Sequence, residues 1–187
     1  MRVIAGSKKG TKLKTIKGLQ VRPTTDRIKE TLFNILNPFL VDAIFLDLFS
    51  GSGAIAIEAL SRGAKQAILV EKDKQALECI RSNLAAVKLE EKAKIIAGDV
   101  FLALNKLQTE KKTFDLIFLD PPYEKELEKQ VLAYLSNCTL IHKQSWIIVE
   151  SSIKTEFSYV SEMGFIIDRE KCYKTNKHVF LSKKTEE

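Results

Sequence analysis

The sequence predicts a doubly wound α/β fold with a mostly parallel seven-stranded sheet, preceded by a basic β-hairpin. Two observations predict this fold. From about residue 43, short apolar runs alternate with helical stretches, which is typical of strand–helix–strand units around a parallel sheet. The last two apolar runs are joined by only a few residues, so we expect that final pair of strands to be antiparallel.

The N-terminal region is expected to hold a small hairpin and a helix. Two short strands, Arg2–Ala5 and Leu13–Ile16, flank a turn rich in glycine and lysine. A hairpin of this size is not stable alone, so it must pack against the main domain. Arg22–Asp26 then begins a helix, with a threonine cap and an acidic first turn, and Asn37-Pro38 ends it. We therefore expect a hairpin extension over residues 1–22 and one domain over residues 23–187.

The remaining elements follow in alternation, each strand ending at a turn. Strands are predicted at Ile44–Leu48, Gln66–Val70, Lys94–Ala97, Phe114–Leu119, Trp146–Glu150, Phe165–Lys171 and His178–Ser182. Helices are predicted at Ala54–Ser61, Lys74–Val87, Val100–Leu107 and Lys125–Leu135, and a short amphipathic stretch at Thr155–Met163.

Composition excludes several classes of protein. No run of 18 or more apolar residues exists, so we expect no membrane span, and the first residues lack the apolar core of a signal peptide. The three cysteines are widely spaced, and the two histidines are isolated, so neither a disulfide framework nor a metal site is expected. The simplest location is the cytoplasm, and no feature demands a dimer, so we expect a monomer.

Positive charge is concentrated at the N-terminus. The chain carries +6, but residues 1–29 alone hold nine basic residues and one acidic residue. A basic arm on a near-neutral body is typical of a polyanion partner, although a solvated basic face is the plainer alternative. The candidate nucleic-acid contacts are Arg2, Lys8, Lys9, Lys12, Arg22 and Arg27.

A second feature is Asp120-Pro121-Pro122-Tyr123, directly after the predicted strand Phe114–Leu119. Two prolines end a strand abruptly, which leaves Asp120 at the carboxyl end, where ligands bind in open α/β sheets. The Asp120 carboxylate and the Pro121 carbonyl can accept both hydrogens of an exocyclic amine, while the Tyr123 ring stacks on the base. A strand-ending turn with a solvated aspartate is the alternative.

A third feature is the glycine-rich turn after the first strand of the sheet. Asp47 precedes Gly51 and Gly53, and Glu71 and Asp99 end the next two strands, where they can accept from a ribose and an adenine amine. The spacing also fits a dinucleotide fingerprint, but a carboxylate beside the turn suits an ammonium group better than a pyrophosphate. S-adenosylmethionine has an ammonium, a ribose and an adenine and no phosphate. The candidate cofactor residues are Asp47, Phe49, Gly51, Ser52, Gly53, Glu71, Lys72, Asp99 and Val100.

With these motifs together, the chain resembles the class I methyltransferases, whose sheet is Rossmann-like. It is most similar to the bacterial family that methylates the N2 amine of a guanine in 16S ribosomal RNA. The resemblance covers nearly the whole chain, through Arg2–Gly6, Arg22–Phe33, Asp47–Gly53, Glu58–Arg62, Glu71, Asn83-Leu84, Asp120–Tyr123 and Val149-Glu150. The family often has Phe where this chain has Tyr123, and the stacking ring is kept.

The resemblance implies the role of each motif. Asp47, Gly51, Gly53, Glu71 and Asp99 would hold S-adenosylmethionine, and Asp120, Pro121, Pro122 and Tyr123 would hold the guanine. The family acts on 16S rRNA in the assembled or late-assembling small ribosomal subunit, and the basic arm would contact that RNA.

Three other functions stay open from the residues alone. The same chemistry on another amine, adenine in DNA or RNA or a protein glutamine, uses a similar motif. A non-catalytic RNA-binding or assembly factor is a second possibility, and a nicotinamide oxidoreductase a third. The intact Asp120–Tyr123 motif disfavours the second, and Asp47 disfavours the third.

Overall fold

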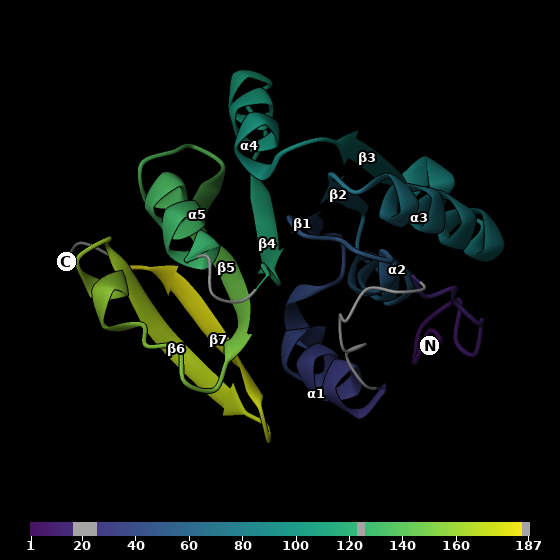
Figure 1. Ribbon diagram of the computed structural model, residues 1–187, viewed down its shortest axis with the longest axis horizontal. Helices are drawn as coiled ribbons and strands as arrows, with labels where there is room; N and C mark the ends of the chain where they lie inside the picture. Colours follow the sequence, from purple (N-terminus) through teal and green to yellow (C-terminus); the bar gives the residue numbers. More distant parts are fainter. Residues whose placement is uncertain (17–25, 123–125, 185–187) are drawn as a thin grey trace. The chain divides into compact units, whose positions relative to one another are not determined.

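The computed structural model describes residues 1–16, 26–122 and 126–184 (Figure 1). The chain folds as two compact units, Met1–Val100 and Phe101–Glu187. Arg22, Thr24, Thr25 and Tyr123, together with the predicted domain boundary at residue 22, lie outside the described residues.

The first unit is built on three parallel strands in the order β3-β2-β1. Asp47 of β1 is level with Leu69 of β2, and Glu71 of β2 is level with Ala97 of β3. The carboxyl ends of the three strands therefore lie at one edge, followed in each case by a turn. The elements are α1 (Asp26–Leu36), η1 (Asn37–Phe39), β1 (Ile44–Asp47), α2 (Ala54–Ser61), β2 (Gln66–Glu71), α3 (Lys74–Val87), η2 (Glu90–Lys92) and β3 (Ala93–Ala97).

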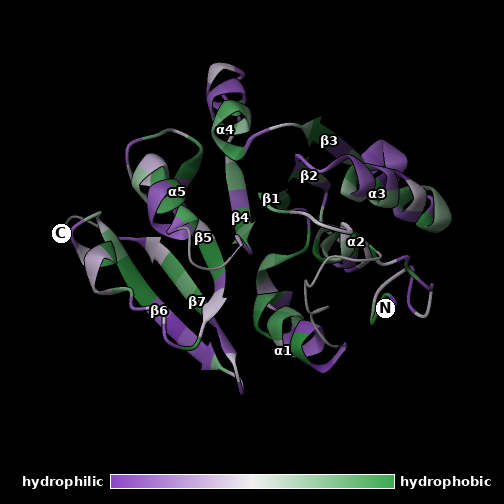
Figure 2. Ribbon diagram, in the orientation of Figure 1, coloured by the Kyte–Doolittle hydropathy of each residue, from purple (hydrophilic) through white to green (hydrophobic). Residues whose placement is uncertain are grey.

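The second unit is built on four strands in the order β4-β5-β7-β6. β4 and β5 are parallel, and β7 is antiparallel to both β5 and β6, as expected for the closing pair. Figure 2 shows the hydrophobic middle of β5 and the hydrophilic second half of β6, a strand that is mostly exposed. The elements are α4 (Val100–Thr109), β4 (Phe114–Leu119), α5 (Leu127–Ser136), β5 (Ile141–Ser152), η3 (Ser158–Ser161), β6 (Phe165–Cys172) and β7 (Asn176–Lys183).

The predicted fold class is confirmed, because the seven strands form one mostly parallel sheet with flanking helices. Strands β1, β2 and β4 are buried along nearly their whole length, which explains their continuous apolar runs. Within the described residues, no helix has the length and apolar character needed to cross a membrane.

Strand β5 begins five residues earlier than predicted. Its first part carries the polar run His142-Lys143-Gln144, which hides the strand in the sequence. A register shift between Phe114 and Leu116 accompanies this part, and the Ser145 hydroxyl donates to the Phe114 carbonyl at 2.6 Å. A side-chain hydrogen bond thus replaces part of the ladder where hydrophobic alternation is absent.

The N-terminal segment folds back on itself without forming the two regular strands that the sequence predicts. An isolated antiparallel bridge joins Arg2 to Lys12. Beside it, the Val3 N–H donates to the Thr11 carbonyl and the Leu13 N–H to the Met1 carbonyl, both at 3.0 Å. Other backbone donors of the segment bond to helix side chains: the N–H groups of Ile4 and Ala5 donate to Glu58, and that of Lys14 donates to Asn83. Side chains of α2 and α3 therefore satisfy the donors that this short pairing leaves over.

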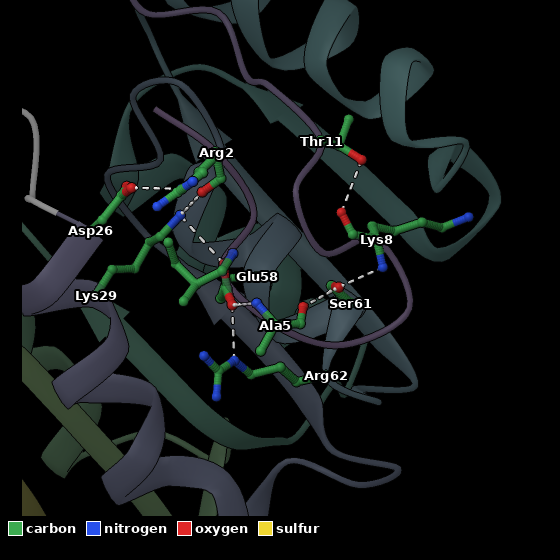
Figure 3. Close-up of polar contacts among 10 residues, drawn as sticks. Arg2, Ala5, Lys8, Thr11, Asp26, Lys29, Glu58, Ser61 and Arg62 are labelled. Atoms are coloured by element: carbon green, nitrogen blue, oxygen red, sulfur yellow. Dashed lines mark hydrogen bonds and ion pairs between the residues drawn. The ribbon is translucent and has the colours of Figure 1, made fainter.

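Glu58 is the centre of this attachment (Figure 3). Its carboxylate is fully buried and accepts from the backbone N–H groups of Ile4 and Ala5 at 2.8 and 2.9 Å. It also pairs with Arg62 at 2.9 Å and with Lys29 at 3.3 Å. Lys29, equally buried on α1, donates onward to the Arg2 carbonyl at 2.5 Å. One charge network thus joins the N-terminal segment, α1 and α2.

The Lys29–Glu58 pair should be a major determinant of stability. Lys29→Met removes one partner of a buried ion pair and leaves the buried negative charge of Glu58 with only Arg62 as a cationic partner. We therefore expect the free energy of unfolding to fall by about 3 kcal/mol. Urea denaturation followed by circular dichroism measures this loss.

Lys65→Met is the matched control, because Lys65 is an exposed lysine of the same unit. Its effect should stay within about 0.5 kcal/mol. Equal effects of the two substitutions would contradict the assigned importance of the network.

Candidate active site

The glycine turn between β1 and α2 has the backbone conformation that its glycines predict. Gly51 and Gly53 have φ values of 52° and 76°, in the left-handed region. A side chain at Gly53 would meet Leu69 and Ile80 at 3.1 and 3.3 Å, whereas nothing lies within 4 Å of the Cβ position at Gly51. Gly53 is therefore required by packing, and Gly51 leaves the backbone open to a ligand.

Asp47, at the end of β1, is a buried carboxylate of unusual character. The residue is 1% exposed, and neither carboxylate oxygen has a hydrogen-bond partner among the described residues. Burial, helped by the negative charge of Glu71, raises the pKa of Asp47 from 3.8 to about 7. The backbone N–H groups of Ala56 and Phe49 and the Ser50 hydroxyl are near the carboxylate without forming well-aligned hydrogen bonds, so they oppose this rise only in part. A cation near the turn would favour the charged form, so the site fits an ammonium or sulfonium group and disfavours a phosphate.

Glu71, at the end of β2, is held by three backbone donors. Its Oε2 accepts from the Gly51 N–H at 2.8 Å, and its Oε1 accepts from the N–H groups of Lys72 and Asp73 at 2.7 and 2.9 Å. The first bond ties Glu71 to the glycine turn. A carboxylate offers about four acceptor positions, so this conformation leaves room for about one hydroxyl rather than the two of a ribose.

The other candidate cofactor residues lie at the same edge of the first unit. The Gly98 N–H donates to the Glu71 carbonyl at 2.9 Å, which brings the end of β3 beside the end of β2. Asp99 is exposed there, and Val100 is buried as the first residue of α4. Phe49 and Ser52 are half-buried in the turn and Lys72 is exposed. The first unit thus gathers the predicted cofactor residues around three adjacent strand ends.

In the second unit, Asp120, Pro121 and Pro122 follow directly after β4, as predicted. Asp120 is half-buried, Pro121 is buried and Pro122 is exposed. A groove of about 500 Å³ begins at Pro121 and is lined also by Glu150, Ser151 and Tyr159. A cavity of this size accommodates a nucleobase with its sugar.

Three of the basic residues predicted to bind nucleic acid line one groove of the first unit. Arg2 pairs with Asp26 at 3.0 Å, with both side chains exposed. Arg2, Lys9 and Arg27 line a shallow groove of about 340 Å³ together with Asp26 and Glu30. Lys12 is exposed and Lys8 is half-buried. The groove therefore brings together basic residues from the N-terminal segment and from α1.

Comparison with known proteins places this geometry in a family. The family model described as "Conserved hypothetical protein 95" matches residues 1–181. The chain is 36% identical over 154 residues to ribosomal RNA small subunit methyltransferase D of Escherichia coli, covering 82% of this chain and 76% of that protein.

The chain belongs to this rRNA methyltransferase family.

Other relatives agree with this membership. YlbH of Bacillus subtilis is 39% identical over 156 residues, with 83% of this chain and 85% of that protein covered. The solved structure of yhhF from Escherichia coli matches with a TM-score of 0.85 and 33% identity, over 100% of this chain and 99% of that one. The methyltransferase class is therefore as the sequence predicts.

Sequence reasoning gave no role to two buried networks of this methyltransferase. Lys29 occupies the apolar face of α1 with Leu32, Phe33 and Leu36, and a lysine at that helical spacing was the available signal for a buried pair. Glu150 and His178 are also buried, and they contact each other at 3.0 Å. No local sequence pattern predicts the pairing of Glu150 with His178, since 28 residues separate them.

The buried Asp47 carboxyl should make the stability of this methyltransferase pH-dependent. It is ionised above about pH 4 in the unfolded chain but stays protonated to about pH 7 in the folded protein. The folded state then binds more protons between these values, so the free energy of unfolding falls as the pH rises. At about 1.4 kcal/mol per pH unit, the loss is about 4 kcal/mol. Urea denaturation at several pH values should show that Asp47→Asn removes this slope.

Asp42→Asn serves as the control, because Asp42 is an exposed aspartate of the same unit and its left-handed φ of 61° suits asparagine. It should keep the wild-type slope. If the free energy of unfolding depended on pH equally in wild type and Asp47→Asn, the buried carboxyl would be excluded as the source of the pH dependence.

Proposed function

We propose that this chain transfers a methyl group from S-adenosylmethionine to the exocyclic N2 amine of one guanine in 16S rRNA. Membership of the rRNA methyltransferase family gives the reaction class and the kind of substrate. The main support for an exocyclic amine as the methylated group is the position of Asp120-Pro121 at the end of β4. The small subunit or its assembly intermediate is the proposed substrate, and the protein is proposed to act on it as a cytoplasmic monomer.

The cofactor is assigned to the first unit. Gly51 lets the ligand approach the backbone, and the cationic methionine tail would stabilise the ionised form of Asp47, which burial disfavours in its absence. Glu71, already oriented by three backbone N–H groups, offers its remaining acceptor position to a ribose hydroxyl. Asp99 is assigned to the adenine amine. Bound S-adenosylmethionine supplies an activated methyl group on sulfur.

The target amine is assigned to Asp120 and to the Pro121 carbonyl, with Tyr123 stacking on the base. The guanine amine is a weak nucleophile because its lone pair is delocalised into the ring. Accepting both of its hydrogens turns the lone pair toward the methyl group. As carbon–nitrogen bond formation places positive charge on nitrogen, the carboxylate of Asp120 stabilises that charge. Alignment of sulfur, carbon and nitrogen supplies much of the remaining rate enhancement.

The basic surface is assigned to the RNA backbone. Arg2, Lys8, Lys9, Lys12 and Arg27, with Arg22, would contact phosphates of the RNA that carries the guanine. The guanine must be unstacked to reach its own groove. The phosphate contacts position the substrate without reading its sequence. Their contribution to affinity should therefore weaken as salt is added.

Methyl transfer from labelled S-adenosylmethionine tests the proposed function. The substrates are unmodified small ribosomal subunits, protein-free 16S rRNA and duplex DNA, each followed by nucleoside analysis. We expect N2-methylguanosine from the subunit or the rRNA, because the amine-binding motif and the basic arm suit a nucleobase in RNA. Methyladenine from DNA, or no transfer despite cofactor binding, would overturn the proposal.

Asp120→Ala should separate chemistry from cofactor binding. Loss of the acceptor should lower single-turnover transfer by at least about 100-fold, since its interaction strengthens in the transition state. Affinity for S-adenosylhomocysteine, measured by calorimetry, should stay within about twofold of wild type. Asp115→Ala, at the other end of β4, is the matched control and should transfer normally. Near-normal turnover by Asp120→Ala would refute the assigned role.

A further inference from the structure

A second carboxylate lies beside Asp120 at the same edge of the second unit. Leu119 of β4 is level with Val149 of the neighbouring parallel strand β5. Asp120 and Glu150 each come one residue after this last pair, where the backbones of paired strands run about 4.8 Å apart. Glu150 lies next to the amine-binding motif, although 30 residues separate it from Asp120 in the sequence.

The two carboxylates also belong to one face of the sheet. Glu150 is paired with His178 of β7, and the His178 ring contacts the Phe118 ring edge-on at 6.1 Å. Side chains alternate along a strand, so Asp120 follows Phe118 on that face. Glu150 and Pro121 both line the 500 Å³ groove. A base that enters this groove would meet Glu150 and Pro121, the residue that follows Asp120.

Glu150 is held in place by a buried hydrogen-bond network. Its Oε1 accepts from the Asn176 amide at 2.7 Å, and its Oε2 contacts His178 Nε2 at 3.0 Å. The other ring nitrogen of His178 contacts the Tyr173 hydroxyl at 3.2 Å. With a neutral ring, Tyr173 donates to Nδ1 and Nε2–H donates to Glu150. Each carboxylate oxygen then has one partner and keeps one further acceptor position.

Guanine differs from the other bases in what its Watson–Crick edge offers. Its N1–H and its N2 amine are adjacent donors, whereas adenine places an acceptor, N1, beside its amine. Two carboxylates side by side match two adjacent donors and repel the lone pair of an unprotonated N1. We propose that Glu150 selects guanine by accepting its N1–H, while Asp120 accepts from the N2 amine. This inference rests on the proposed function and adds the residue that determines its base specificity.

The test uses the full-length protein and compares guanine with 2-aminopurine at the methylated position. 2-Aminopurine keeps the N2 amine but has an unprotonated N1. The substrates are small subunits reconstituted with rRNA that carries either base at the guanine mapped by wild-type transfer. Wild type should methylate guanine at least about 100-fold faster, because a site built for an N–H donor rejects an analogue that lacks it. Glu150→Gln should reduce this ratio at least about tenfold, since an amide can donate to N1.

The ratio separates specificity from folding and from activity in general. Asp168→Asn, an exposed acid-to-amide change on β6, is the matched control and should keep the wild-type ratio. Tyr173→Phe is a milder second variant, which loosens His178 without touching the carboxylate and should lower the ratio about two- to fivefold. If Glu150→Gln does not fold, the ratio measured with Tyr173→Phe tests whether Glu150 determines the preference for guanine.

Failure of this inference and failure of the proposed function give different results. If wild type methylates guanine and the variants keep the wild-type ratio, Glu150 does not read N1–H and this inference alone falls. If wild type does not methylate guanine at all, the proposed function falls with it.

Discussion

The buried carboxylate of Glu58 is the interaction on which the N-terminal half of the molecule depends. It neutralises Lys29 and Arg62 and accepts from two backbone N–H groups of the N-terminal segment. The segment pairs with itself only over a short stretch, around the bridge from Arg2 to Lys12, and such a small hairpin is not stable alone. Its position is therefore fixed by the contacts with α1 and α2. The basic residues proposed to bind RNA depend on this one attachment for their position.

Asp47 is the opposite case within the same unit. Both carboxylates are buried, but Glu58 has four partners and Asp47 has none among the described residues. A satisfied buried charge stabilises a specific arrangement, whereas an unsatisfied one is a cost in the absence of a ligand. We propose that a cationic ligand, S-adenosylmethionine, offsets this cost. Burial alone thus does not distinguish a structural carboxylate from a functional one, and the partners do.

The fold was largely predictable, and the candidate cofactor residues stand where their motifs placed them, because both follow from local patterns. Continuous apolar runs mark strands buried on both faces, and the bounds of α2, α3 and β4 were predicted to the residue. The glycine turn and Glu71 were likewise visible, since each stands where a strand ends. The early start of β5 was missed, because His142, Lys143 and Gln144 interrupt the apolar pattern while side-chain hydrogen bonds maintain the pairing.

The sequence by itself determined the sheet, the strand-end motifs and the class of chemistry, because periodicity and strand-terminating residues act over a few positions. Only the tertiary structure decided which distant groups meet. The pairing of Lys29 with Glu58 and of Glu150 with His178 depends on strand order and helix packing, as does the pairing of Leu119 with Val149, which brings Glu150 to the end of β4. Such contacts join residues about 30 apart, and no local pattern encodes them. Their energy comes from burial, which exists only once the chain has folded.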